Sequence, residues 1–288
     1  MAVTVRWKAG AERQVSQEWW RGGIGTRLVR AFRSGACRFV RNRSQVIPWI
    51  RDMHAAVLPQ GPAEGLCFIP IEGQKTQLIG YLLIACLRGE AVVVDPPCGT
   101  TELILALLAE HEARLTKVLR THVHQVDTDD ATALCVRSGA RLVMRRGGTR
   151  VVDAGHEVFE VEAGVTLRIG GECIHVLSTP GHTPTCVSYL WRDRLFCGDV
   201  FDLGSCAVGN NEAEPSRLYD TLTRCVFDLP DETLVFPAHS IKGRRVALLG
   251  ELRARYGTVL GHSRDAFITE MGLRRIVRPA LGRMLPPG

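Results

Sequence analysis

The chain lacks several features that mark common protein classes. Its ten cysteines include no Cys-x-x-Cys pair and no repeated spacing, which argues against a disulfide framework or a structural zinc ribbon. We therefore interpret them as free thiols of a protein from a reducing compartment. The longest apolar run, Leu78–Leu87, is much shorter than the roughly 20 residues that a membrane-spanning helix needs. We expect no membrane partner.

Acidic residues are missing between Glu18 and Asp52, and the charge is distributed accordingly. Residues 1–52 hold eleven Lys or Arg and three Asp or Glu, whereas the remaining 236 residues hold 25 and 27. The net charge of +6 therefore belongs to the N-terminal part. Since nucleic-acid-binding domains usually carry an excess of basic residues, we expect no nucleic-acid partner for the rest of the chain.

The basic N-terminal part has a pattern of its own. From Arg21 to Arg43, arginines alternate with apolar residues, which is typical of an amphipathic organelle-targeting segment. A solvated basic extension, or a helix on the surface of the domain, is the alternative. Prolines and glycines between residues 59 and 65 indicate a linker. We therefore predict an extension over residues 1–60 and one domain over residues 61–288.

The predicted domain alternates short strands with helices in both of its halves. This order favours an α/β protein in which two sheets pack face to face with helices outside. The expected strands cover 66–70, 77–86, 91–95, 117–121, 141–144, 158–160, 165–169, 173–177, 186–191, 194–197 and 233–236. The expected helices cover 101–115, 129–138, 215–227, 245–255 and 264–271.

Candidate metal ligands follow four of these strands. His122 and His124 stand two residues apart, and alternate residues of a strand share a face. Neutral imidazole suits zinc, iron and copper. His182, Asp199 and His239 each follow a further strand and each has a simple alternative, such as bonding a turn or capping a helix. Together they favour one site, because functional groups gather on loops at the edge of a sheet.

Four motifs occur in a fixed order in the chain. They are Thr-His-x-His at 121–124, Thr-Pro-Gly-His-Thr-Pro at 179–184, Phe-Cys-Gly-Asp at 196–199 and Phe-Pro-Ala-His at 236–239. From about residue 66 to 279 the chain resembles the metallo-β-lactamase superfamily. It is most similar to the persulfide (sulfur) dioxygenase branch, with the glyoxalase II hydrolases next. The resemblance implies the α/β fold of a metallo-β-lactamase-like four-layer αβ/βα sandwich.

The chain departs from the family at one motif. The family pattern His-x-His-x-Asp-His ends here in Val126 and Asp127. The resemblance implies that these two positions serve the second metal ion of dinuclear members. That second site would keep only His239, a share of Asp199 and, allowing a one-residue insertion, Asp127. A hydrolase that uses a metal-bridged hydroxide needs a better-filled site.

The ligands that the resemblance implies for a single iron are all present. They are His122, His182 and Asp199, a 2-His-1-carboxylate set typical of non-heme Fe(II) oxygenases. The resemblance thus implies one Fe(II) per chain, with O2 and glutathione persulfide or a related small thiol as reactants. Sulfite and thiol would be the products. His124 and His239 would orient the ligands or make polar contacts nearby.

Two other functions are compatible with the sequence. One is a zinc-dependent hydroxyacylglutathione hydrolase of glyoxalase II type. The other is a degenerate member that binds a thiol without catalysis. In the persulfide dioxygenase branch, the loop after the Gly-Asp motif contains an Arg and an Asp, and the stretch Gly204–Asn210 lacks both. We expect a location in the mitochondrial matrix, or otherwise in the cytoplasm, and leave a homodimer open.

Overall fold

The computed structural model describes most of the chain from residue 65 onward. Its described residues are 3–7, 12–15, 37–39, 65–73, 78–123, 130–147, 158–201, 213–240, 243–261 and 263–282. The chain divides into two compact units, Met1–Met53 and His54–Gly288. The predicted boundary near residue 60 lies outside the described residues, so it stays a prediction.

The first unit contains a three-stranded antiparallel sheet in the order β2-β1-β3. Its strands are β1 (Val3–Trp7), β2 (Glu12–Val15) and β3 (Cys37–Phe39). Strand β3 lies within the stretch predicted as a targeting segment, and the rest of that stretch lies outside the described residues. The targeting role therefore stays a prediction.

The second unit holds two six-stranded sheets. The first has the order β4-β5-β6-β7-β8-β9, with β4 to β6 antiparallel and β6 to β9 parallel. Two of its parallel connections run through helices α4 (Thr101–Glu110) and α5 (Ala131–Ser138), as crossovers between parallel strands require. The strands are β4 (Leu66–Glu72), β5 (Ile79–Ala85), β6 (Glu90–Val94), β7 (Arg114–Leu119), β8 (Arg141–Arg145) and β9 (Val158–Val161).

The second sheet has the order β10-β11-β12-β13-β14-β15 and is antiparallel except between β13 and β14. Helix α6 (Pro215–Arg224) lies in the connection between these two parallel strands. Helices α7 (Leu249–Leu260) and α8 (Arg264–Gly282) follow the sheet. The strands are β10 (Thr166–Ile169), β11 (Glu172–Ser178), β12 (Val187–Trp191), β13 (Arg194–Gly198), β14 (Leu234–Pro237) and β15 (Ala247–Leu248).

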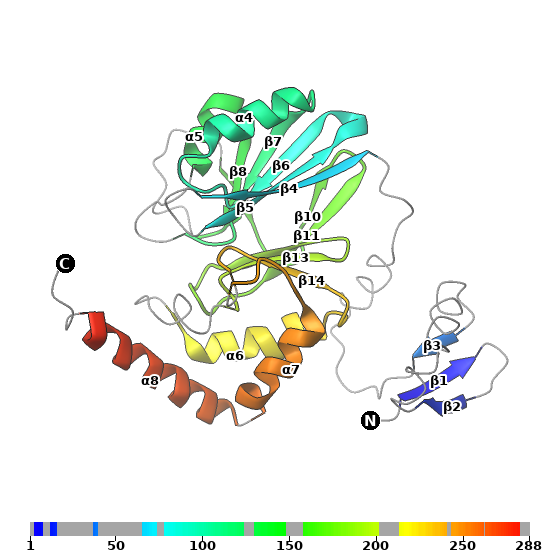
Figure 1. Cartoon of the computed structure of the whole chain (residues 1–288), viewed down its shortest axis with the longest axis vertical. Coiled ribbons are helices and arrows are strands. Elements are labelled where there is room, and N and C mark those ends of the chain that lie inside the picture. Colours follow the sequence, from blue (N-terminus) through cyan, green and yellow to red (C-terminus); the bar gives the residue numbers. More distant parts are fainter. Residues whose placement is uncertain are drawn as a thin grey trace. The chain divides into compact units, whose positions relative to one another are not determined.

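The elements of the second unit form four layers. Helices α4 and α5 cover the outer face of the first sheet, and α6, α7 and α8 lie beyond the second sheet (Figure 1). This arrangement confirms the predicted sandwich of two sheets between helices. Among the described residues, no helix combines the length and the apolar character needed to cross a membrane.

The second unit has two apolar cores, and strands such as β5, which are buried on both faces, lie between them. On β5, Tyr81 and Leu83 face the second sheet, whereas Leu82 and Ile84 face the helices, because successive side chains of a strand point to opposite faces. All four side chains are almost completely buried. The continuous apolar sequence of β5 is thus explained by burial on both sides.

The predicted helices have different limits in the structure. The helices expected over 215–227 and 264–271 cover Pro215–Arg224 and Arg264–Gly282, and strand pairing explains the limits of two others. The helix expected over 101–115 ends at Glu110, because the chain turns at Glu112 with a φ of 50° and enters β7 at Arg114. The helix expected from residue 245 begins at Leu249 instead. Residues 247–248 pair with β14 as the edge strand β15. At both places the helix boundary depends on pairing with a neighbouring strand. The local spacing of apolar residues does not reveal such pairing.

Candidate metal centre

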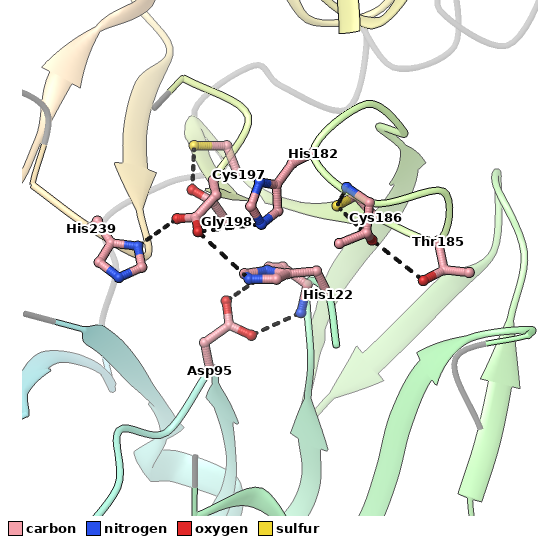
Figure 2. Close-up of polar contacts among 11 residues, drawn as sticks. Asp95, His122, His182, Thr185, Cys186, Cys197, Gly198 and His239 are labelled. Carbon is pink, nitrogen blue, oxygen red and sulfur yellow. Dashed lines mark hydrogen bonds and ion pairs between the residues drawn. The ribbon is translucent and has the colours of Figure 1, made fainter. Parts of the chain in front are cut away.

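Three histidines and one aspartate converge where four strands end. His122 lies shortly after β7, His182 in the turn after β11, Asp199 directly after β13 and His239 shortly after β14. Figure 2 shows the rings of His122, His182 and His239 directed toward a common region. Residues more than 100 positions apart in the sequence thus form one cluster.

The distances within this cluster suit a single metal ion. The Nε2 atoms of His122 and His182 each lie 3.6 Å from Oδ2 of Asp199. The two rings stand nearly perpendicular, with centroids 4.9 Å apart. Ligand atoms bound at about 2.1 Å to one ion lie roughly 3 to 3.6 Å from each other. The three side chains could therefore share one ion with little rearrangement, and their ligand atoms all lie within 4.8 Å of one another.

The burial of Asp199 supports the same conclusion. Asp199 is 2% exposed, and within the part of the chain that the structure describes its Oδ2 atom accepts no hydrogen bond. A buried carboxylate oxygen without a donor is costly, and a cation between it and the two imidazoles would remove that cost. The donor set and its geometry therefore fit a bound metal ion.

The other carboxylate oxygen of Asp199 has a partner. Nδ1 of His239 lies 2.7 Å from Oδ1 and donates a hydrogen bond to it. Burial by itself would raise the pKa of Asp199, but this hydrogen bond and the electrostatic attraction of the nearby histidines hold the pKa well below its usual range. Asp199 is therefore ionised, with Oδ1 occupied and Oδ2 left to face the other two histidines.

The tautomer of His122 follows from the residues behind it. The carboxylate of Asp95 accepts hydrogen bonds from the backbone N–H of Thr121 at 2.8 Å and from its hydroxyl at 2.7 Å. The same hydroxyl lies 2.8 Å from Nδ1 of His122. A hydroxyl has one hydrogen, so Thr121 can only accept from Nδ1–H. The unprotonated Nε2 of His122 is thereby directed at the metal position, as in other metal-ligating histidines.

A glycine allows these groups to approach each other. Gly198 has a φ of +57°, and a Cβ atom there would lie 2.5 Å from the hydroxyl oxygen of Thr121. The backbone is also tied across the site, because the N–H of Ala238 donates to the carbonyl of Gly198 at 3.0 Å. The Gly-Asp motif thus places Asp199 beside the chain that carries His122.

The structure corrects one step of the sequence argument and adds a residue. Strand β7 ends at Leu119, so the expectation that His122 lies on a strand face was wrong, although the residue does reach the site. His124 and Asp127 lie outside the described residues, and their roles stay predictions. The sequence motifs by themselves assign no role to Asp95. Its position after a buried strand and before Pro96 was the available signal.

Comparison with known proteins agrees with this geometry. No model of a protein family matches the chain. The crystal structure of ETHE1 from Myxococcus xanthus is 35% identical with a TM-score of 0.66, and the match covers 76% of this chain and 95% of that chain. A metallo-β-lactamase from Staphylococcus aureus shares the fold at 18% identity with a TM-score of 0.61, covering 72% of this chain and 67% of that one. The chain belongs to the metallo-β-lactamase superfamily.

Within this superfamily, two kinds of enzyme are similar to the chain. The mitochondrial persulfide dioxygenase ETHE1 of Homo sapiens is 28% identical over 203 residues, which are 69% of this chain and 78% of the human protein. The hydroxyacylglutathione hydrolase of a Polaromonas strain is 35% identical over 175 residues, which are 58% of this chain and 64% of the hydrolase. The chain thus spans less than two thirds of the hydrolases that it matches. Both relatives are enzymes, which supports the prediction that this chain is an enzyme.

Proposed function

We propose that the chain is a non-heme Fe(II) persulfide dioxygenase that oxidises glutathione persulfide, or a related small persulfide, to sulfite. The observation that carries this proposal is the cluster of His122, His182 and Asp199, whose ligand atoms lie within 4.8 Å of one another. Two histidines and one carboxylate on one side of an ion leave positions open for O2 and substrate. One Fe(II) per chain would be held by these three residues.

Iron bound there supplies the redox chemistry that allows O2 to react with sulfur. The residues of the chain prepare the site for it. Asp95 and Thr121 hold His122 with Nε2 unprotonated, and His239 occupies one oxygen of Asp199 so that the other faces the metal position. The overall reaction converts one persulfide, one O2 and one water into one thiol, one sulfite and two protons.

The sequence of the second metal site favours this reaction over hydrolysis. Val126 and Asp127 stand where the family pattern has Asp and His. A two-metal hydrolase relies on a second ion to hold or activate its nucleophile. The chain also covers more of ETHE1 from both organisms than of the hydrolases.

A zinc-dependent hydroxyacylglutathione hydrolase is the second candidate. Its support is the 35% identity to the Polaromonas hydrolase. Both candidates act on a glutathione derivative in which sulfur carries the reacting group, so a glutathione-derived substrate is common to them. A thiol-binding member without catalysis is the remaining alternative. A mitochondrial location stays a prediction from the N-terminal sequence.

Oxygen uptake distinguishes these functions. The full chain is loaded anaerobically with Fe(II) and mixed with glutathione persulfide in an oxygen-electrode cell. We expect uptake with one sulfite formed per O2, and loss of uptake in Asp199→Ala. The matched control is Asp193→Ala, because Asp193 lies in the turn between β12 and β13 of the same sheet and its side chain is 50% exposed.

The outcomes separate the candidates. Uptake that persists in Asp199→Ala would refute the ligand assignment. Absence of uptake together with zinc-dependent cleavage of a hydroxyacylglutathione thioester would establish the hydrolase instead. Iron or zinc bound without either reaction would favour the thiol-binding member.

A further inference from the structure

Two tyrosines in the core between the sheets are hydrogen-bonded to the chain that carries the metal-centre histidines. The hydroxyl of Tyr189 donates to the carbonyl of Arg120 at 2.8 Å. The hydroxyl of Tyr81 donates to the carbonyl of Pro237 at 2.6 Å. Each acceptor carbonyl lies two residues before a histidine of the site. The tyrosines thus contact the backbone of the histidine-bearing loops rather than the histidines themselves.

A backbone hydrogen bond accompanies each tyrosine in the same pattern. The N–H of Val187, two residues before Tyr189, donates to the carbonyl of Thr121 at 2.8 Å. The N–H of Ile79, two residues before Tyr81, donates to the carbonyl of Ala238 at 2.8 Å. At both places, one strand therefore binds the two consecutive carbonyls that precede a histidine. The repetition in two unrelated sequence segments indicates a shared task.

The two contacts cross between the sheets in opposite directions. Tyr81 belongs to β5 of the first sheet and bonds the end of β14 in the second sheet. Tyr189 belongs to β12 of the second sheet and bonds the residue that follows β7 in the first. Pairing within a sheet cannot set the position of one sheet edge relative to the other. These hydrogen bonds do so at the edge where the site lies.

Both hydroxyls can serve only as donors to these carbonyls. Tyr81 is 2% exposed and Tyr189 is fully buried, and burial raises the pKa of both tyrosines above the usual value. They therefore stay protonated over the working pH range. The ring of Tyr81 stacks on Phe68 with centroids 5.9 Å apart, and this contact does not involve the hydroxyl. Substitution by phenylalanine therefore removes the donor and preserves the packing.

We propose that Tyr189 and Tyr81 are positioning residues that fix His122 and His239 for metal binding by holding the backbone of each histidine-bearing loop from the opposite sheet. Metal ligands must be held within about 0.5 Å of their working geometry. A loop that has lost its hydrogen bond to the tyrosine samples a wider range of backbone positions. The inference rests on the proposed metal centre but not on which reaction takes place there.

The test compares tyrosine-to-phenylalanine variants of the full chain, using the metal alone as probe. Co(II) is titrated into the metal-free protein, its affinity is measured against a competing chelator, and its visible absorption reports the coordination geometry. Unfolding of the metal-free protein by urea is measured in parallel. The control is Tyr219→Phe, because Tyr219 on α6 packs against Phe267 with centroids 5.5 Å apart and lies on another element.

We expect Tyr189→Phe to weaken Co(II) binding about tenfold, the lower end of the range for residues that support metal ligands. We expect a smaller loss in Tyr81→Phe, because His239 acts on the metal through Asp199. Both variants should change the Co(II) spectrum, and Tyr219→Phe should change neither quantity. Should Tyr189→Phe fail to fold, Tyr81→Phe tests the same proposal.

Two results would overturn the inference and are distinguishable. Wild-type affinity and spectrum in both variants, with lower stability of the metal-free protein, would show that the tyrosines support the fold alone. A wild-type chain that binds no Co(II), Zn(II) or Fe(II) would refute the metal centre itself, and the positioning role with it.

Discussion

Replacing Gly198 by alanine should damage both the fold and the metal centre. Gly198 has a φ of +57°, and an added Cβ would lie 2.5 Å from Oγ1 and 2.9 Å from Cβ of Thr121. The left-handed conformation alone costs a non-glycine residue about 1 to 2 kcal/mol. The close contact adds to this, because one of the two groups must move.

Thr121 cannot move without breaking its own contacts. Its N–H and hydroxyl donate to the Asp95 carboxylate at 2.8 and 2.7 Å, and a hydrogen bond to a charged group contributes about 1.5 to 3 kcal/mol. Loss of one such bond and the conformational cost together predict that Gly198→Ala lowers the free energy of unfolding by about 2.5 to 5 kcal/mol. The displaced Thr121 would also release Nδ1 of His122, so metal affinity should fall.

Gly139→Ala is the matched control. Gly139 has a φ of +70°, but its added Cβ would have no atom within 4 Å. In this variant the free energy of unfolding should fall only by the conformational cost of about 1 to 2 kcal/mol. Its metal affinity should equal that of the wild type. Urea unfolding of the metal-free proteins and Co(II) titration measure both effects. Equal destabilisation by the two substitutions, with unchanged Co(II) affinity, would show that the close contact between Gly198 and Thr121 has no role in the fold or the metal centre.

Two further substitutions test other parts of the structure. The Asp130 carboxylate accepts hydrogen bonds from the N–H and hydroxyl of Thr101 at 2.8 and 2.7 Å, and although burial opposes it, these bonds lower the pKa of Asp130. Asp130→Ala should lower the free energy of unfolding by about 1 kcal/mol at pH 7. This stabilisation is present above the unfolded pKa of about 3.9 and is lost as the pH falls through the lower folded value, so urea unfolding of the two proteins should converge in acid. Restoring the family motif with Val126→Asp and Asp127→His should raise bound zinc toward two ions per chain by elemental analysis. Unchanged stoichiometry would mean that the second site is missing for another reason.

Most strands were predictable because burial leaves a local trace. The apolar run of β5 and the alternation in β10, where Leu167 and Ile169 are buried and their neighbours exposed, are visible in the sequence itself. The ends of the elements were less predictable. The start of β7 at Arg114 depends on pairing with Glu90 of β6, and no local pattern reports such a partner.

The ligand residues could be named from motifs, but the groups that hold them could not. His182 and Asp199 each follow a strand and stand in a distinctive local sequence. Asp95, by contrast, is separated from Thr121 by 26 positions, and Tyr189 from Arg120 by 69. The first contact exists only once β6 and β7 have paired, and the second only once the two sheets have packed together.

The class of fold, the family and the candidate ligands can all be read from local sequence, because periodic burial and short motifs are local properties of the chain. Three features require the folded chain: which oxygen of Asp199 faces the metal position, which nitrogen of His122 is unprotonated and which tyrosines hold the loops of the site. These features depend on distances between atoms from different strands and, for the tyrosines, from different sheets. Such distances are defined only after the strands have paired and the two sheets have packed together.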